Sequence, residues 1–316
     1  MITFEGIPYE AEPAETVLDC LLRHGLEVPS FCRNGACQSC LLKVTSGAVP
    51  ARTQAGLRLS LAQSGAFCSC ICPTDKELTL ERLESAQSYG SKILEVRQAS
   101  SRVAIVRLSR PSGLAFEAGQ FVYVRRTVDG IERPYSLASL PSDEFLELHV
   151  AIFPDGALSP WLSREVGAEL EIRGPFGDCT YVADETEAPL LFAGTGTGLA
   201  PLVGVLRSAL ARGHKGPLYL YHGARDSNDF YFSSELLALR QSQPTLEVNE
   251  LSTDLVQHVL ERHPESKQFR SYLCGAPDFV QKLKKRLYLQ GSPLARIHSD
   301  PFFSKAPSGV TVSAAP

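Results

Sequence analysis

The stretch that decides the fold of the first segment reads Cys32-Arg-Asn-Gly-Ala-Cys37-Gln-Ser-Cys40. Three thiols lie here at a C-x4-C-x2-C spacing, and three further cysteines follow between residues 68 and 72. This is the ligand spacing of a 2Fe-2S cluster, in which four thiolates hold two irons. Such a cluster carries net negative charge, so its loop needs inward-pointing backbone N–H groups and little steric bulk, and Gly35 suits that requirement. The stretch therefore predicts an iron-sulfur site.

The fourth ligand has to come from Cys68, Cys70 or Cys72. Here the sequence resembles plant-type ferredoxins, in which twenty-nine residues separate the last two ligands, and Cys40 and Cys70 have that separation. The resemblance implies a ligand set of Cys32, Cys37, Cys40 and Cys70, with Cys68 or Cys72 as alternatives for the last position. A structural zinc site is the competing interpretation, but zinc sites favour paired C-x2-C knuckles and the stretch holds one such pair.

The residues around this loop show the pattern of a small sheet with one helix. Residues 2–10 alternate as a short hairpin does. From Val17 to Leu22 the apolar residues recur at helical spacing, and Gly25 follows as a C-cap. Leu78 to Leu80 stands where plant-type ferredoxins have a short strand after the last cysteine.

Composition and charge exclude several classes of protein. At about 150 residues per domain, 316 residues predict two or three domains. A hydrophobic content of 44%, a charged content of 21% and a net charge of -4 are those of a soluble globular protein without the basic bias that attracts nucleic acid. Neither a signal peptide nor a membrane-spanning run is visible, and the nine cysteines favour reduced thiols and metal over a disulfide framework. We therefore expect a cytoplasmic protein that binds neither nucleic acid nor membrane.

The middle segment changes to a period of two. Residues 84–91 are small and polar and are interpreted as a linker. After it Phe121 to Val124 alternates, Asp129-Gly130 is a hairpin signal, and the apolar residues from Leu146 to Ile152 fall on one face of a strand. Several strands with one short helix near residues 158–164 predict a small antiparallel barrel.

Three short patterns on this barrel resemble the ferredoxin-NADP reductase superfamily of flavoproteins. They are Arg133-Pro-Tyr-Ser136, Gly156-Ala-Leu-Ser159 and Gly174-Pro-Phe-Gly177. The resemblance implies that Arg133 binds the FAD pyrophosphate as a fork of donors, that Tyr135 packs on the isoalloxazine and that Ser136 lies near its N5. The remaining flavin contacts that it implies come from Pro134, His149, Val150, Gly156 and Ser159.

The third segment opens with a strand that runs into a glycine-rich turn and a helix, over residues 189–213. Such a unit places free N–H groups where a pyrophosphate can bind, so Gly194, Thr195, Gly196, Thr197 and Gly198 are candidate nucleotide-binding residues. Further strands at 218–221 and 271–273 alternate with helices, which predicts a parallel sheet with its ligands at the carboxyl edge.

The same superfamily implies which residues lie near the nicotinamide. Its glycine loop and its C-G-x-P turn place Thr197, Cys274 and Gly275 near the hydride path, and a terminal aromatic, here Phe302 or Phe303, covers the flavin. The segment from Leu246 to Asp254 resembles a shortened form of the family's aromatic-bearing loop.

The choice of nucleotide depends on the residues after the second strand of this segment. Arg225 suits a 2′-phosphate or flanks a ribose, while Asp226 and Asp229 repel extra phosphate charge. This favours NADH, with NADPH as the alternative.

Taken together, the motifs predict a β-grasp 2Fe-2S ferredoxin domain (1–90), an antiparallel β-barrel FAD domain (91–186) and a parallel-sheet α/β NAD(P) domain (187–303), followed by a disordered tail (304–316). The order resembles oxygenase electron-transfer components of the benzoate dioxygenase reductase type. The expected reaction passes hydride from NAD(P)H to FAD and single electrons through the cluster to a partner oxygenase, with Ser136, Thr197 and Cys274 as catalytic residues. The alternatives are a reductase for a sugar-deoxygenating or other iron-sulfur enzyme, and a non-catalytic metal-binding interaction protein.

Overall fold

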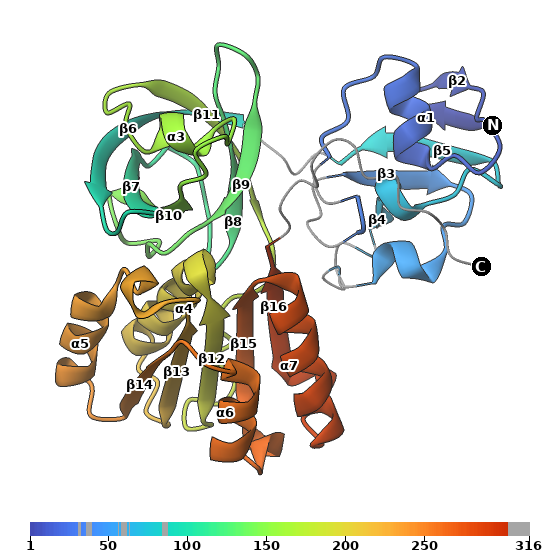
Figure 1. Ribbon diagram of the computed structural model, residues 1–316. Helices are drawn as coiled ribbons and strands as arrows, with labels where there is room; N and C mark the ends of the chain where they lie inside the picture. The colour runs from blue at the N-terminus through green and yellow to red at the C-terminus, as the bar shows by residue number, and fades with distance from the viewer. Residues whose placement is uncertain are drawn as a thin grey trace. The chain divides into compact units, whose positions relative to one another are not determined.

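The computed structural model describes residues 1–30, 33–35, 40–55, 57, 62, 64–83 and 88–302 (Figure 1). Its compact units are Met1–Ser85 and Ala86–Phe302. Within the described ranges, the helices are too short or too polar for any of them to cross a membrane.

The first unit is a mixed sheet with one helix packed on it, the β-grasp arrangement. The strand order is β2-β1-β5-β3-β4, and β1 pairs antiparallel with β2 but parallel with β5. Helix α1 begins where Thr16 Oγ1 accepts the backbone N–H of Asp19 at 3.2 Å, and its apolar side buries Leu18 and Leu21 in one core with the sheet. The elements are β1 (Ile2–Phe4), β2 (Ile7–Tyr9), α1 (Val17–Arg23), β3 (Leu41–Ser46), β4 (Ala66–Cys68) and β5 (Leu78–Arg82).

The second unit starts with an antiparallel sheet that closes on itself. Its strand order is β10-β7-β6-β11-β8-β9, and an isolated bridge between Leu137 and Leu148 joins the two edges. Leu146, Leu148 and Val150 are buried in the barrel interior, as the alternation in the sequence predicts. The elements are β6 (Ser88–Gln98), β7 (Val103–Ser109), β8 (Phe121–Arg125), β9 (Glu132–Ser136), β10 (Phe145–Ala151), α3 (Ser159–Leu162) and β11 (Glu169–Phe176).

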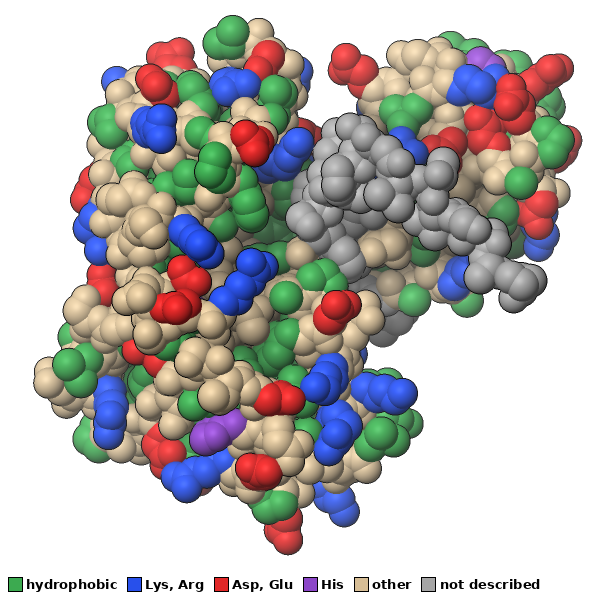
Figure 2. Space-filling model, viewed as in Figure 1, with side chains coloured by type: hydrophobic (Ala, Val, Ile, Leu, Met, Phe, Trp, Pro, Cys, Tyr) green, Lys and Arg blue, Asp and Glu red, His purple; other side chains and the backbone are tan. Residues whose placement is uncertain are grey.

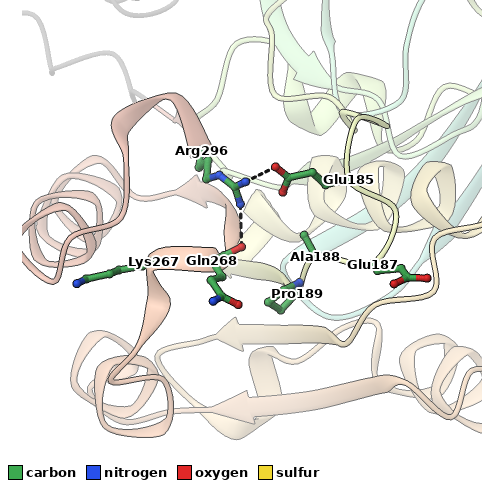
Figure 3. Close-up of a pocket in the computed structure, with 7 residues that line it drawn as sticks. All are labelled: Glu185, Glu187, Ala188, Pro189, Lys267, Gln268 and Arg296. Carbon is green, nitrogen blue, oxygen red and sulfur yellow. Dashed lines mark hydrogen bonds and ion pairs between the residues drawn. The ribbon is translucent and has the colours of Figure 1, made fainter.

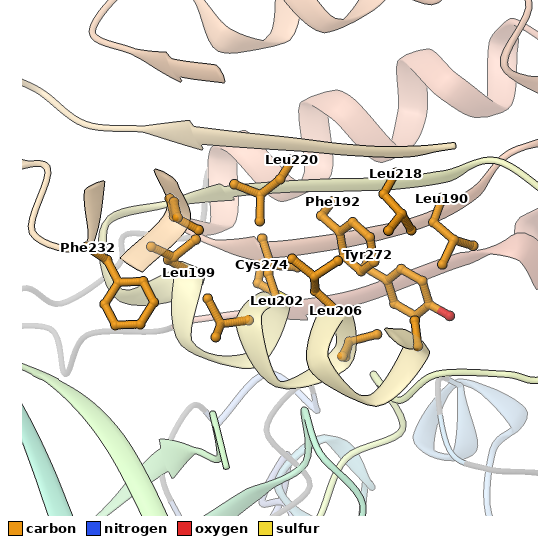
Figure 4. Close-up of a cluster of buried hydrophobic side chains, with 14 of the residues drawn as sticks. Leu190, Phe192, Leu199, Leu202, Leu206, Leu218, Leu220, Phe232, Tyr272 and Cys274 are labelled. Carbon is orange, nitrogen blue, oxygen red and sulfur yellow. The ribbon is translucent and has the colours of Figure 1, made fainter. Parts of the chain in front are cut away.

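A parallel sheet with helices on both faces completes this unit (Figure 1). Its order is β14-β13-β12-β15-β16. Leu190 and Phe192 of β12 belong to the core under α4 and α5 (Figure 4), whereas Leu191 and Ala193 belong to the core under α6 and α7. The elements are β12 (Leu190–Thr195), α4 (Leu199–Ala211), β13 (Leu218–Gly223), α5 (Ser233–Ser242), β14 (Leu246–Leu251), α6 (Leu255–Arg262), β15 (Arg270–Gly275), α7 (Pro277–Leu289) and β16 (Ile297–Pro301).

This strand order fixes where a ligand can bind. The helix that follows β12 and the helix that follows β15 pack on opposite faces of the sheet. The crevice outside the carboxyl ends of these two neighbouring strands is therefore the ligand position of an open α/β sheet. The predicted fold class, with its β-grasp, barrel and parallel-sheet parts, is confirmed.

Three local details differ from the sequence interpretation. The stretch expected to be a shortened loop forms the edge strand β14, because Leu246 and Val248 alternate toward the core under α5. Strand β6 begins at Ser88, inside the segment interpreted as a linker, because residues 88–92 pair with β11. Helix α3 spans only Ser159–Leu162.

The surface carries charges of both signs. On the face shown in Figure 2, acidic and basic side chains are interspersed rather than gathered by sign. This agrees with 31 basic and 35 acidic residues in the chain.

Candidate functional site

Two of the predicted cluster ligands, Cys40 and Cys70, lie within the described residues; Cys32 and Cys37 lie outside them. Cys40 directly precedes β3, and Cys70 lies in the 3-10 helix η2 (Ser69–Ile71). Ser69 holds the two together, because its N–H and its hydroxyl both donate to the Cys40 carbonyl oxygen, at 3.2 and 2.7 Å. Interactions with the thiols of Cys68 and Cys70 lower the pKa of Cys40 well below its ordinary value. A thiolate at this position fits a metal ligand.

The two alternative ligands differ from each other. Cys68 is fully buried in β4 and donates its thiol to the Gly35 carbonyl oxygen at 3.3 Å, so it lies beside the predicted cluster loop. Cys72 donates to the carbonyl oxygen of Pro73 at 3.6 Å. Burial, together with the charge of Asp75, raises the pKa of Cys72 to about 11, which opposes the thiolate that a metal needs. The raised pKa disfavours Cys72 as a ligand, whereas the contact with Gly35 keeps Cys68 near the site.

The first group of predicted flavin residues, 133–136, lies on strand β9. This strand is at one end of the strand order of the barrel sheet. Ser136 ends the strand, is nearly buried, and donates its hydroxyl to Asp300 Oδ2 at 3.4 Å. Arg133, Pro134 and Tyr135 precede it and are half-buried. Ser136 thereby links the barrel directly to β16 of the nucleotide domain.

Strand β10 presents its predicted residues differently. The Val150 side chain is fully buried in the barrel interior. The His149 side chain is also buried, and its Nδ1 lies 2.8 Å from the hydroxyl of Tyr231 in the nucleotide domain. Both side chains are buried within the protein, so neither side chain faces open space where a cofactor could bind.

The second flavin pattern forms a tight turn. An added Cβ at Gly156 would lie 2.8 Å from Ser159 Oγ and 2.9 Å from the Phe153 carbonyl oxygen. Ser159 Oγ accepts the N–H of Phe153 at 3.1 Å. The turn therefore needs glycine at position 156, and the serine holds it in shape.

The glycine-rich turn and the C-G-x-P turn meet at the crevice between β12 and β15. An added Cβ at Gly198 would lie 2.5 Å from the Cys274 carbonyl oxygen, and one at Gly275 would lie 2.5 Å from Thr195 Oγ1. That same oxygen accepts the N–H of Ala276 at 2.9 Å. Gly194, at the end of β12, is close-packed too, since its Cβ would meet Leu202 at 2.6 Å.

Gly196 differs from the other glycines of this turn. Its φ is 54°, and an added Cβ would meet nothing within 4 Å. It lies in the 3-10 helix η3 (Gly196–Gly198), which leads into α4, so the first N–H groups of this helix point away from the helix body. Thr197, half-buried, follows it. This part of the turn is the one that faces open space, as a pyrophosphate site requires.

Cys274 lies at the carboxyl end of β15, but its thiol is fully buried and lies 3.6 Å from the Cys179 sulfur. Burial, and the neighbouring Cys179, raise the pKa of the Cys274 thiol. In the sheet register Cys274 is paired with Asp300, which accepts from Ser136. Sequence reasoning missed Asp300 and Cys179, since neither lies in a recognised motif.

The residues predicted to select the nucleotide follow β13. Arg225 and Asp226 are exposed, and Asp226 caps the short helix η4 (Ser227–Asp229) by accepting the N–H of Asn228 at 2.9 Å. Asp229 is turned toward Arg102, at 3.7 Å. Phe302 donates its N–H to the Gly275 carbonyl oxygen at 2.7 Å, and its alternative Phe303 lies outside the described residues.

A cavity of about 440 Å³ lies at the other end of the sheet (Figure 3). Its lining includes Pro189, just before β12, and Gln268, just before β15. Because these residues precede the strands, the cavity lies at the amino edge, opposite the glycine-rich turn. It is distinct from the predicted nucleotide site.

Three segments of the chain match known domain families. Residues 2–75 match the family described as a 2Fe-2S iron-sulfur cluster binding domain, residues 91–181 an oxidoreductase FAD-binding domain, and residues 192–285 an oxidoreductase NAD-binding domain. The predicted 2Fe-2S, FAD and nicotinamide cofactors are thereby confirmed.

Full-length relatives match as well. A Ralstonia ferredoxin–NAD(P)+ reductase component of naphthalene 1,2-dioxygenase/salicylate 5-hydroxylase systems is 31% identical over 95% of this chain and 96% of its own. The reductase subunit of an Amycolatopsis aromatic O-demethylase is 30% identical over 95% of this chain and 98% of its own. The crystal structure of an Amycolatopsis cytochrome P450 reductase matches with a TM-score of 0.67 and 29% identity, over 95% of this chain and 98% of that one. The chain therefore belongs to the family of oxygenase-type NAD(P)H-dependent ferredoxin reductases, in which a 2Fe-2S ferredoxin domain is fused to FAD- and NAD-binding domains.

Proposed function

We propose that the chain takes hydride from NADH and delivers single electrons to a terminal oxygenase. The observation that carries the proposal is the meeting of Ser136 of the barrel, Asp300 of β16 and the Cys274 turn at the carboxyl edge of the parallel sheet. Bound FAD accepts the two electrons of a hydride, and a 2Fe-2S cluster carries them one at a time. The relatives named as reductase components of dioxygenase systems support the same assignment.

The protein's own residues position rather than react. We propose that Ser136, Thr197 and the turn at Cys274, whose thiol is buried, fix the nicotinamide against the flavin, and that Asp300 orients Ser136 through their 3.4 Å contact. The domain division at residues 90, 186 and 303 is proposed for the same reaction, with one cofactor class in each segment. A cytoplasmic location is also proposed, because it is where NADH and reduced thiols are maintained.

The visible absorption spectrum of the purified protein tests the proposal. We expect flavin bands together with a reddish iron-sulfur absorption, both bleached by NADH under anaerobic conditions. A colourless protein that contains zinc would overturn it. Faster reduction of a terminal oxygenase, of either the Rieske or the di-iron type, than of a sugar-deoxygenating iron-sulfur enzyme at equal concentration would support the oxygenase assignment, and the reverse order would reject it.

We propose Cys70 as the fourth cluster ligand. Its support is the contact through Ser69 to Cys40 and the ferredoxin spacing. Cys70→Ser is expected to lose most of its iron and its cluster absorption, while the matched variant Cys72→Ser keeps both. Cys68→Ser is the third variant to be measured, because Cys68 lies beside the loop. If Cys70→Ser kept its full cluster and Cys68→Ser lost its cluster, the fourth ligand would be Cys68 instead.

We propose NADH as the preferred donor. Asp226 is exposed after β13, where it opposes the charge of a 2′-phosphate, whereas Asp229 is engaged by Arg102. Asp226→Asn is expected to lower the ratio of kcat/KM for NADH over NADPH by about tenfold, since a like-charge contact costs on the order of 1 kcal/mol or more. Asp229→Asn is the matched control with a smaller change. A ratio that Asp226→Asn leaves unaltered would remove Asp226 from the selection.

A further inference from the structure

We propose that His222 is a positioning residue for the pyrophosphate-binding turn, acting through the Gly196 carbonyl group. His222 lies near the carboxyl end of β13, in a strand that carries no recognised nucleotide motif. The proposal rests on the proposed binding of the nucleotide at the glycine-rich turn, and it adds the group that holds this turn in its binding conformation.

The first observation is the contact itself. The His222 side chain is fully buried, and its Nε2 lies 3.1 Å from the Gly196 carbonyl oxygen. A carbonyl oxygen only accepts hydrogen bonds, so Nε2 carries the proton and donates it. The same oxygen also accepts the N–H of Leu199 within the first helical turn. Two donors from different elements therefore hold one carbonyl group in the inward direction.

The second step concerns the peptide that this carbonyl group belongs to. A trans peptide is planar, so its C=O and N–H point in opposite directions. With the Gly196 oxygen held inward, the N–H of Thr197 points outward, toward the open space that Gly196 faces. If this peptide rotated, an oxygen would face the bound phosphate and repel it. The φ of Gly196, 54°, lies in the left-handed region that glycine adopts without strain.

The third observation is that the histidine ring is itself fixed. Its Nδ1 lies 3.7 Å from Glu250 Oε1, beyond hydrogen-bonding distance, so the ring is fixed by its burial and by aromatic packing rather than by a second hydrogen bond. The rings of Phe230 and Tyr231 pack edge-on against the imidazole, with centroids 5.4 and 5.7 Å away. Because the ring cannot swing toward solvent, the Nε2–H donor is preorganised for Gly196.

A trio of substitutions separates hydrogen bonding from packing. The amide nitrogen of glutamine reaches the Nε2 position of histidine, whereas that of asparagine reaches only the Nδ1 position. His222→Gln is therefore expected to keep the bond to Gly196, and His222→Asn and His222→Leu to lose it. Losing one buried hydrogen bond that orients the turn is expected to raise KM for NADH by about two- to tenfold, with kcat changed less than about twofold.

The assay measures NADH oxidation with ferricyanide as acceptor, together with inhibition by ADP-ribose, which contains the pyrophosphate, and by adenosine, which does not. Flavin content and melting temperature are measured on each variant. The proposal expects ADP-ribose inhibition to weaken in His222→Asn and His222→Leu, to stay near wild type in His222→Gln, and adenosine inhibition to stay unchanged in all three.

Equal KM and ADP-ribose inhibition in all variants would overturn the role of His222. So would a loss of flavin and of stability that is the same in His222→Gln and His222→Asn, because that outcome marks a purely structural residue. Failure of the wild-type chain to bind ADP-ribose would instead overturn nucleotide binding at this turn, so the two failures are distinguishable.

Discussion

Replacing Gly275 by alanine tests the close packing of the two turns that meet at the crevice. An added Cβ would lie 2.5 Å from Thr195 Oγ1, 2.6 Å from its carbonyl oxygen and 2.9 Å from its nitrogen. Two of these atoms belong to the backbone, so the strand end of β12 itself has to shift. The φ of Gly275 is 117°, which an alanine rarely adopts.

The expected decrease in the free energy of unfolding of Gly275→Ala has two parts. An L-residue in the left-handed region costs about 1–2 kcal/mol, and overpacking of a tight site adds about 1–3 kcal/mol. Gly213 is the matched control, because its φ is 76° but an added Cβ meets nothing within 4 Å. The two alanine variants therefore differ by the packing part, about 2 kcal/mol, together with the larger backbone cost of an L-residue at the φ of 117°, so about 2 kcal/mol is the least difference expected.

For a unit of this size, about 2 kcal/mol corresponds to roughly 6 °C in melting temperature. Gly275→Ala is expected to melt at least that much below Gly213→Ala in differential scanning calorimetry, and to lose most of its NADH:ferricyanide turnover, which Gly213→Ala keeps. Equal melting temperatures, or full turnover in Gly275→Ala, would refute the argument that the two turns are held by close backbone contact.

Two further predictions concern the contact between barrel and nucleotide domain. Tyr231→Phe removes the hydrogen-bond partner of buried His149 Nδ1. Because that group is then left unsatisfied, the free energy of unfolding measured by urea titration is expected to fall by about 1–3 kcal/mol. The double variant His149→Phe/Tyr231→Phe is expected to lose less than the sum of the losses in the two single variants. Burial alone would raise the pKa of Glu147, but His149 at 3.7 Å and Arg207 at 3.1 Å lower it from 4.5 to about 2. Because the folded pKa lies below the unfolded one, the stabilisation is complete above pH 4.5 and is lost as pH falls toward 2. Wild type is expected to lose about 1 kcal/mol more than Glu147→Gln between pH 6.5 and pH 4, and equal losses would contradict this linkage.

Those parts of the fold that rest on local periodicity could be predicted from the sequence. Helix α1 and barrel strand β10 follow from their apolar spacing, and the parallel sheet follows from the strand, glycine turn and helix at residues 189–213. Strand β14 could not be predicted in this way, because an edge strand buries only one side and Leu246 and Val248 alone carry the signal.

The proposed site residues likewise divide into those that lie in sequence motifs and those that do not. Ser136 and Cys274 lie in motifs, so the sequence indicates them. Asp300 and His222 do not, because each acquires its role from a neighbour distant in sequence: Asp300 from Ser136, and His222 from Gly196. Such contacts arise from the strand order of the sheet and from the packing of barrel on sheet, which no short pattern encodes.

The glycine-rich turn shows why a motif alone is a weak guide to a phosphate site. At Gly194, Gly198 and Gly275 an added Cβ would lie only 2.5 or 2.6 Å from a neighbouring atom, so close packing within the protein favours glycine at each of these positions. These three let the ends of β12 and β15 approach, so they would be needed even if no nucleotide bound. Gly196 alone among the four has open space around its Cβ position, and it is the residue whose carbonyl group His222 holds inward. Substituting the three packing glycines therefore tests the fold, whereas substituting Gly196 or His222 tests the binding of the nucleotide.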